Sequence, residues 1–417
     1  MSGPQAFELR LHGERVGALE VENDGARWVW WFDPAWLDVS PRPTLSLRLR
    51  ELRLTGRRTD NRPPPFVTNL LPERGSALRG RLARVHGLSE RDDAALLTLL
   101  GGDMSGALQV IPGPGAPRPR AERLAASAAP LARYRASLGG MQLKFSANRS
   151  TRINLAADGE TGKYILKIPL PSQRDLPSLE AATLTWAEAV GFEAPEREVV
   201  PSSEIEGLPP ELIEGIDVCL LVRRFDRPSG DERLHMEEIC SAMGYHPEEK
   251  YPADAAPTQR PLTHTLAGVG GTIRRYAGVE AAHAFVERVV FDALAGNGDA
   301  HLKNWAFVFP DRVNARLAPV YDVLPTFLVV PGDDSLALPI SGHDLVGVKA
   351  FEGVTPGVIR SLAKKLQLDP DESEARSRAL VARAVSSFDA AIAPWALRTE
   401  REQTWRAHLG RVAAKWA

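Results

Sequence analysis

Apolar and polar residues alternate along the first 32 positions, which is the pattern of β-strands with one buried face. Phe7, Leu9 and Leu11 alternate with polar residues, and a turn at residues 12–14 separates them from a second apolar run that begins at Val16. A third run, Arg27–Phe32, follows. The first part of the chain is therefore predicted to consist of strands.

Helical spacing replaces this alternation from about residue 67. We predict helices over residues 76–86 and 90–100, the second with Ser89 as its N-cap. Residues 112–119 then read PGPGAPRP, which cannot be regular structure because proline fixes φ and removes backbone donors. We take residues 112–120 as a linker, so that residues 1–111 form a small N-terminal α/β domain.

Beyond the linker the pattern predicts strands first and helices later. Strands at residues 152–155 and 163–168 flank the turn signal Asp158-Gly159, which predicts a hairpin. The other predicted elements are a helix at 178–190, with Ser178 as its candidate N-cap and Gly191 just past its end, and strands at 199–200 and 218–225. Further helices are predicted at 234–243, 281–295 and over most of 356–416. This order is typical of an α+β fold in two lobes, which we place at residues 121–226 and 227–417.

Composition narrows the class of protein. The chain has 417 residues, 44% of them hydrophobic, which excludes global disorder. Its 51 basic and 53 acidic residues give a net charge of -2, so any case for nucleic-acid binding must be local. Cys219 and Cys240 are too few for a disulfide framework, and no apolar run is long enough for a signal peptide or a membrane span. We expect a cytoplasmic protein with no membrane partner.

One local concentration of charge stands out. Residues 42–84 contain eleven arginines against Glu51, Asp60 and Glu73, a local balance of +8. A solvated surface, or pairing with acidic groups elsewhere, is favoured over a surface that faces DNA or a protein partner.

The richest candidate for chemistry lies at residues 291–309. An apolar helix ends at a Gly/Asn turn, a dense polar cluster follows, and an apolar strand comes next. Asp299 and Asn304 are five residues apart, the spacing of a kinase base and a magnesium ligand. A second magnesium-binding Asp should follow a short strand pair, and Asp322 lies there between apolar neighbours. Taken alone, the spacing of Asp299 and Asn304 would be typical of turn and cap residues.

Two further residues of this loop join the candidate set. We assign His301 and Lys303, with Asp299, to the catalytic residues. His301 would either orient the loop by hydrogen bonding or touch a phosphate, and orientation is the favoured role.

The nucleotide should then bind upstream. Lys167 lies on a predicted strand, where kinases keep a phosphate-binding lysine, and Glu180 on the next helix is either its ion-pair partner or a solvated side chain. Residues 218–227 run from an apolar strand into a charged segment, as a hinge between lobes would, with Phe225 near the adenine or in the core.

A glycine-rich segment precedes this predicted hairpin. Gly139 and Gly140 would let backbone amides approach a phosphate, and Gln142 and Lys144 follow them. No G-x-G-x-x-G motif and no Walker lysine motif is present.

In this order the motifs resemble the HipA family of toxin serine/threonine kinases. The matching pieces are residues 69–73, 102–109, 137–144, 164–169, 224–227, 234–251, 298–304 and 321–322. The resemblance implies a bilobal protein-kinase-like core, related to lipid kinases, behind a small N-terminal domain. It departs from the family at Leu143 and Arg223, where better-known members often carry Glu.

The resemblance also implies ATP and Mg²⁺ as cofactors and a role for each matched residue. Asp299 would be the base, Asn304 and Asp322 the magnesium ligands, Lys167 the phosphate contact, Phe225 the adenine contact and Ser137 an autophosphorylated serine. Phosphorylation of Ser137 would add about two negative charges beside a phosphate site and so inhibit the enzyme.

The implied partners are a HipB-like helix-turn-helix antitoxin, operator DNA through that antitoxin, and a protein substrate such as an aminoacyl-tRNA synthetase. Two alternatives stay open at this stage. One is a small-molecule phosphotransferase on the same core, and the other is a non-catalytic ATP-binding co-repressor.

Overall fold

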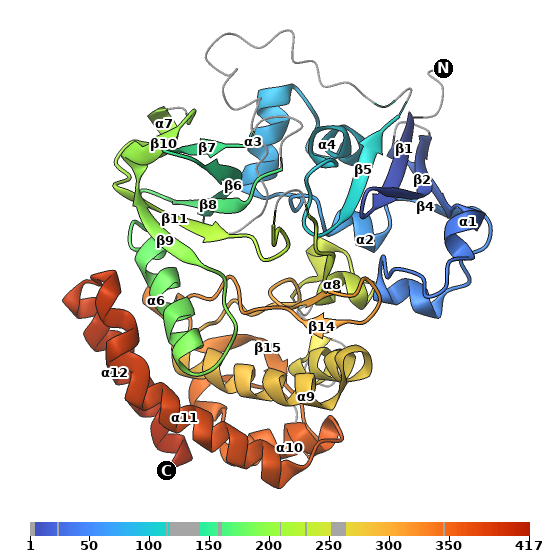
Figure 1. Ribbon diagram of the computed structural model, residues 1–417. Coiled ribbons are helices and arrows are strands. Elements are labelled where there is room, and N and C mark those ends of the chain that lie inside the picture. The colour runs from blue at the N-terminus through green and yellow to red at the C-terminus, as the bar shows by residue number, and fades with distance from the viewer. Residues whose placement is uncertain are drawn as a thin grey trace.

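The N-terminal strands form an antiparallel sheet in the computed structural model. The structure describes residues 5–22, 25–113, 116, 142–156, 161–208, 210–229, 232–251, 264–344 and 347–417. β1 (Gln5–Leu11), β2 (Glu14–Glu22) and β3 (Arg27–Phe32) follow one another as a meander, and β4 (Arg58–Asp60) and β5 (Leu108–Pro112) extend it in the order β4-β3-β2-β1-β5 (Figure 1). The alternation places Phe7, Leu9 and Leu11 in the core, as predicted.

The two helices predicted for this domain are present. They are α3 (Ala77–His86) and α4 (Asp93–Leu100). The expectation that Ser89 caps α4 is wrong, because Asp92 is the N-cap and its carboxylate accepts a 2.9 Å hydrogen bond from a backbone N–H of the first turn. The hydroxyl of Ser89 accepts from a backbone N–H in the preceding turn, so it sits outside the helix.

The second sheet has six strands, in the order β10-β7-β6-β8-β11-β9. Its strands are β6 (Gln142–Arg149), β7 (Ile153–Leu155), β8 (Tyr164–Pro169), β9 (Arg197–Pro201), β10 (Ile205–Glu206) and β11 (Val218–Arg223). The predicted hairpin of β7 with β8 is wrong, because β6 lies between them and pairs with both. The glycines before β6 favoured a loop interpretation, although Phe145 and Ala147 alternate with polar residues as in a strand.

Two elements beyond this sheet depart from the prediction. α6 is Leu176–Ala189, two residues earlier than expected, with Asp175 rather than Ser178 at its N-cap. Its C-cap is Val190, and Gly191 lies just past the end as predicted, with a φ of +108° that suits glycine. The helix predicted at 234–243 is instead β12 (Met236–Glu238) followed by α8 (Ile239–Ala242), because β12 pairs with β13 (Ala306–Val308).

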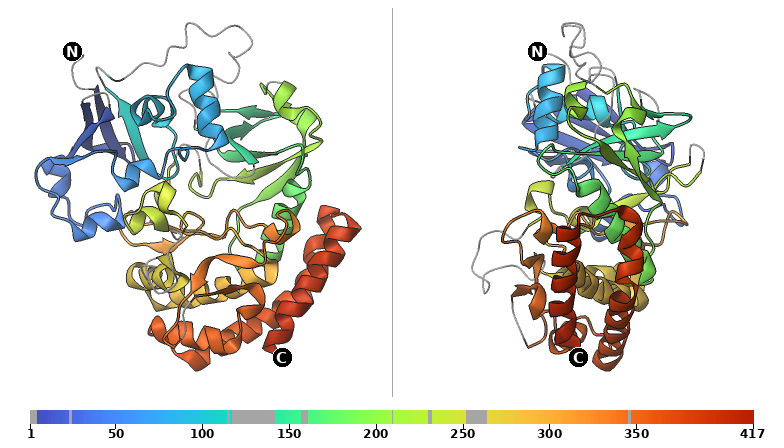
Figure 2. Two further views of the ribbon diagram at one scale, coloured as in Figure 1. Left: turned by 180° about the vertical axis from the view of Figure 1, so that it is seen from behind. Right: turned by 90° about the vertical axis from the view of Figure 1, so that its left-hand side faces the viewer.

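The second lobe is mostly helical, as the period predicts. Its long helices are α9 (Leu266–Ala295), α10 (Pro356–Lys365), α11 (Pro370–Ile392) and α12 (Thr399–Ala413). α11 and α12 run beside each other along one side of the lobe (Figure 2). Its strands are β12, β13, β14 (Arg316–Leu317), β15 (Ser335–Ile340) and β16 (Val348–Ala350). In the described part of the chain no helix is both apolar and long enough to cross a bilayer.

Short helices complete the fold. They are α1 (Pro34–Leu37), α2 (Pro65–Thr68) and α7 (Pro210–Ile213), together with the 3-10 turns η2 (Leu47–Glu51), η4 (Ser202–Glu204), η5 (Pro247–Glu249), η8 (Thr326–Leu328), η9 (Phe351–Gly353), η10 (Ala393–Trp395) and η11 (Ala414–Trp416).

An aromatic cluster fixes α6 against the helical lobe. The ring of Trp186 lies 5.1 Å from that of Phe291, 5.0 Å from that of Phe388 and 5.9 Å from that of Trp405, and its Nε1 donates to a carbonyl of α11. Such contacts bury a large aromatic area and add directional packing. α6 therefore belongs to both lobes, and Glu180 on its opposite end is carried into the space between them.

The arginines of residues 42–84 are largely engaged within the protein. Ion pairs join Arg48 to Glu51, Arg57 to Glu20, Arg62 to Glu248, and Arg74 and Arg79 to Asp93. For these five arginines, the prediction that they pair with acidic groups is confirmed.

A buried charge network joins the N-terminal domain to the hinge. Asp103 is fully buried and accepts a 2.9 Å bond from Arg227, whose other nitrogen lies 2.8 Å from Asp226. Arg224 lies 2.8 Å from Asp226 and also contacts Asp103. Since an unpaired buried charge is strongly destabilising, the network requires the two parts of the chain to fold together.

Replacing Asp103 tests this dependence. We expect Asp103→Asn to lower the free energy of unfolding by about 3 kcal/mol, because Arg224 and Arg227 lose a buried counter-charge. Denaturant titration of the purified chain measures the change. The matched control is Asp389→Asn, which removes an exposed ion pair with Arg406 and should cost less than about 1 kcal/mol. Equal losses in the two variants would contradict the role of the network.

The same network predicts a loss of stability in acid. Burial by itself would raise the pKa of Asp226, but Arg224 and Arg227 outweigh it and lower that pKa to about 2, and arginines likewise lower the pKa of Asp103. A carboxylate with a depressed folded pKa stabilises the fold above its unfolded value of 3.8 and loses that contribution as pH falls toward 2. Unfolding midpoints measured between pH 6 and 3 should fall steeply below pH 4, and less steeply in Asp103→Asn.

Candidate active site

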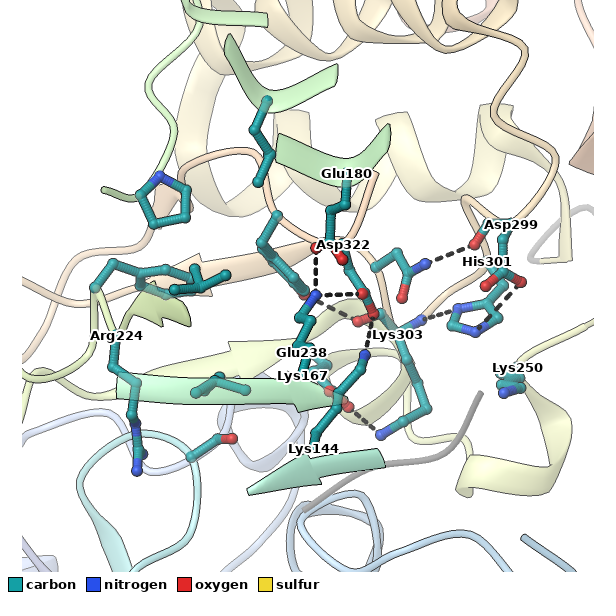
Figure 3. Close-up of a pocket in the computed structure, with 18 of the residues that line it drawn as sticks. Lys144, Lys167, Glu180, Arg224, Glu238, Lys250, Asp299, His301, Lys303 and Asp322 are labelled. Carbon is teal, nitrogen blue, oxygen red and sulfur yellow. Dashed lines mark hydrogen bonds and ion pairs between the residues drawn. The ribbon is translucent and has the colours of Figure 1, made fainter. Parts of the chain in front are cut away.

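A cavity of about 400 Å³ lies between the six-stranded sheet and the helical lobe. Most of the predicted site residues line it together (Figure 3). They are Lys144, Lys167, Glu180, Phe225, Asp299, His301, Lys303, Asn304 and Asp322. Gln142 begins β6, but its side chain, like the whole of Ser137, Gly139 and Gly140, lies outside what the structure describes.

Asp322 is the electrostatic centre of this cavity. One carboxylate oxygen lies 2.7 Å from the ammonium of Lys144 and the other lies 2.8 Å from that of Lys167 (Figure 3). The β6–β8 register sets these two lysines directly opposite each other, so that both ammonium groups reach one carboxylate. Burial would raise the pKa of Asp322, but the lysines dominate and hold it far below its usual range.

Glu180 completes a charge-balanced group. Its carboxylate pairs with Lys167, so Lys167 bridges Glu180 on α6 and Asp322 on the other lobe. Burial would lower the pKa of Lys167, yet the two carboxylates carry it well above its ordinary value, so the amine stays charged. The interpretation of Glu180 as the ion-pair partner of Lys167 is confirmed by this contact, and Glu180 is not a solvated side chain.

The backbone at Asp322 is strained. Its φ is +56°, in the left-handed region that few residues without a glycine's freedom adopt. Such conformations persist where surrounding contacts impose them, and they gather at functional sites. The preceding residue, Tyr321, is anchored by a 2.9 Å hydrogen bond from its hydroxyl to the carbonyl of Lys303. The two loops that carry the candidate magnesium ligands therefore support each other.

The loop with Asp299 starts where α9 stops. Gly296 ends the helix with φ +72°, and a Cβ there would collide with the ring of Phe327, so both conformation and space require glycine. The amide of Asn304 donates a 2.6 Å hydrogen bond to the carbonyl of Asp299. This bond closes the loop. It uses the amide nitrogen of Asn304, so the amide oxygen takes no part in it.

Asp299 sits at the mouth of the cavity, with its side chain 41% exposed. The hydroxyl of Tyr251 donates to its Oδ1. His301 Nε2 is 3.9 Å from the same oxygen, beyond hydrogen-bond range. Partial burial raises the pKa of Asp299, and the bond from Tyr251 opposes that rise.

His301 and Lys303 contact the loop more than the open cavity. Nδ1 of His301 accepts a 3.3 Å bond from the backbone of Lys303, and burial with nearby lysines keeps the pKa of His301 well below its usual value. The ammonium of Lys303 pairs with Glu238 (Figure 3). It also donates a 2.9 Å bond to the carbonyl of Asn69. Lys303 thus ties the loop to the N-terminal domain and is turned away from Asp299.

The other end of the cavity is apolar. Ile165, Val222 and Met236 line it, and the rings of Phe225 and Tyr321 lie 5.7 Å apart, tilted by 43°. β11 ends immediately before this point, as expected for a hinge. One end of the cavity therefore suits a flat ring and the other suits phosphates.

The donor set at the polar end suits magnesium carried with a nucleotide. The described residues contain no group of three or more His, Cys, Asp or Glu side chains able to hold a metal by themselves. Mg²⁺ in nucleotide enzymes is bound by one or two protein oxygens together with substrate phosphates, so Asn304 and Asp322 fit that role.

Sequence reasoning missed several residues of this site. Tyr251 and Glu238 lie in a segment that the sequence marks only through its match to the family, and Asn69 and Glu73 lie in the N-terminal domain, far from the loop in sequence. Apart from the family match, which also covers residues 69–73, the one signal was the polar pair Glu237-Glu238 within an apolar run, since buried acids need partners.

Comparison with known proteins identifies the family of this chain. Residues 136–390 match the family described as HipA-like C-terminal domain, and residues 7–111 match the HipA N-terminal domain. Y4dM of Sinorhizobium fredii, which carries a provisional kinase name, is 35% identical over 87% of this chain and 86% of its own length. The serine/threonine-protein kinase toxin HipA of Shewanella oneidensis is 24% identical over 69% of this chain and 68% of its own.

A solved structure shows the same fold. HipA from the Shewanella oneidensis complex of HipA, HipB and operator DNA superposes with a TM-score of 0.74 at 19% identity, covering 98% of this chain and 96% of that one. Family models match both parts of the sequence, and the chain belongs to the HipA family.

Proposed function

We propose that this protein is an ATP-dependent protein serine/threonine kinase of the toxin type. One observation carries the proposal: Lys144 and Lys167 converge on Asp322, with Glu180 paired to Lys167, beside the loop that holds Asp299 and Asn304. A lysine held between two carboxylates and a nearby Asp–Asn loop are the parts that phosphoryl transfer requires.

The proposed roles follow from position. Bound ATP with Mg²⁺ supplies the phosphoryl group and offsets its charge. Lys167 and Lys144 contact phosphates, Asn304 and Asp322 hold the magnesium, and the ring of Phe225 covers the adenine at the apolar end. Asp299 takes the proton of the attacking hydroxyl, for which its position at the cavity mouth is suited.

His301 and Lys303 act by positioning in this scheme. His301 orients the loop through its bond with the backbone, the role that the sequence favoured. Lys303, which the sequence grouped with the catalytic residues, holds the loop through Glu238 and Asn69. We further propose that Gly139, Gly140 and Gln142 form a phosphate-covering loop and that Ser137 is its autophosphorylated serine, as in the resembling family.

Removal of the base tests the kinase hypothesis. Incubated with labelled ATP and Mg²⁺, the wild-type chain should label itself at Ser137, located by mass spectrometry. Asp299→Asn should reduce the rate by about 10²-fold or more, because a carboxylate that accepts a proton typically contributes that much. Asp322→Asn should also abolish labelling, since the lysines lose their shared partner and the magnesium a ligand.

The control for that experiment is Asp311→Asn, an exposed turn aspartate of the same lobe, which should label at the wild-type rate. Labelling of no protein, with phosphate passed only to small molecules, would favour the phosphotransferase alternative. A full biological effect of Asp322→Ala would favour the non-catalytic co-repressor.

The protein's partners are proposed from its relatives. HipA of Shewanella oneidensis forms a complex with HipB and its operator DNA, and a HipB-like helix-turn-helix antitoxin would bind this chain at an operator in the same way. A translation component would be the protein substrate. Since Arg48, Arg57 and Arg79 are engaged within the chain, its own contribution to DNA binding should be small.

Gel-shift titration checks that expectation. The chain alone should bind a duplex from upstream of its own gene weakly, without sequence preference and with steep loss in salt. Addition of a helix-turn-helix protein encoded beside it should create specific binding. Tight, sequence-specific binding by the chain alone would contradict the proposal that it reaches DNA through the antitoxin.

A further inference from the structure

Tyr251 makes a contact that the proposed mechanism leaves unexplained. Its hydroxyl donates to Oδ1 of Asp299, the proposed base. Within the described part of the chain, no other side chain hydrogen-bonds that carboxylate, because His301 is 3.9 Å away and the amide of Asn304 binds the backbone carbonyl instead.

The contact reproduces what an acceptor must do. A serine or threonine hydroxyl that is about to be phosphorylated has to donate its hydrogen to the base and lie at the open side of it. Tyr251 is 44% exposed and Asp299 41% exposed, so the bond between them forms at the open side rather than within the core. The hydroxyl of Tyr251 therefore occupies the position beside Asp299 that the hydroxyl of a substrate would need.

The way Tyr251 is held suits a displaceable occupant. Its ring meets that of His301 edge-on with 4.9 Å between centroids, and the ammonium of Lys250 lies 5.3 Å from the ring. Lys250 is in turn bound to Glu73 of the N-terminal domain at 2.8 Å. The two contacts of the ring, with His301 and with Lys250, are weak, and Tyr251 itself is 44% exposed, so the ring can leave without opening the core.

We propose, on the basis of the proposed kinase function, that Tyr251 occupies the acceptor site and that a protein substrate must displace its hydroxyl from Asp299. Tyr251 thereby sets which acceptors are used, since only a segment that binds the cavity mouth well enough replaces it. The N-terminal domain takes part through Glu73 and Lys250.

The chemistry requires the phenol to remain a spectator. Burial and the charge of Asp299 raise the pKa of Tyr251 well above its ordinary value, so its hydroxyl keeps its proton and donates. In the transfer itself, the substrate oxygen forms a bond to the γ-phosphorus and its proton goes to Asp299. The bond from that phosphorus to the β–γ bridging oxygen breaks, and its electron pair leaves with ADP.

Tyr251→Phe tests the proposal, because it keeps the ring against His301 and Lys250 and removes only the hydroxyl. Two acceptors serve as probes: water, followed as ATP hydrolysis, and dephosphorylated casein, followed with labelled ATP. We expect kcat for ATP hydrolysis and kcat/KM for casein each to rise roughly tenfold, the equivalent of one hydrogen bond to a charged group. The KM for ATP should stay unchanged.

The matched control is Tyr276→Phe, which removes another phenol that donates to an exposed carboxylate, that of Glu51 at 3.0 Å, and should leave both rates unchanged. A fall in kcat without a change in the casein KM would show that Tyr251 positions the base, and would overturn the proposal. Unchanged rates would also overturn it, as would phosphate found on Tyr251 of the wild-type chain.

The outcome for the proposed function is separate. Transfer by the wild type that is lost in Asp299→Asn, with no gain in Tyr251→Phe, would overturn this inference alone. Absence of transfer to casein, to water and to the chain itself in every variant would overturn the kinase function and the inference with it.

Discussion

The pairing of Asp322 with two lysines is the interaction on which the active site depends. Lys144 and Lys167 come from neighbouring strands of one lobe, and Asp322 comes from a strained turn of the other. Charges removed from water are costly unless partners surround them, so this group is stable only when β6, β8 and α6 are all in place. With Glu180 the group holds two positive and two negative charges, a balance that phosphates and magnesium can replace on binding.

The N-terminal domain supports the active site through contacts with the hinge and the catalytic loop. Asp103 is buried against Arg227 at the hinge, Asn69 accepts a bond from Lys303 of the catalytic loop, and Glu73 binds Lys250 beside Tyr251. Its apolar core also continues into the six-stranded sheet, because Phe145 and Leu166 belong to the same buried cluster as residues of the first strands. Changes in this domain can therefore reach the base through Lys303 and Lys250.

Much of the candidate site was visible in the sequence, because its residues belong to short local patterns. Asp299 and Asn304 share one loop, and Lys167 and Asp322 each lie within an apolar run. The ambiguous residues were those whose role depends on a distant partner. Glu180 could have been solvated until Lys167 was seen against it, and Lys303 was grouped with the base until Glu238 and Asn69 were seen to hold it.

Local pattern alone determined the type of most elements, the α+β class and the residues able to do chemistry, since periodicity and residue type are properties of neighbours in sequence. Only the tertiary structure decided which strands pair. β6 enters between β7 and β8, and β12 replaces an expected helix because β13 offers it a partner. It also decided that Tyr251 meets Asp299, 48 residues away. Pairing and contact over such separations follow from packing of whole layers, which no local window contains.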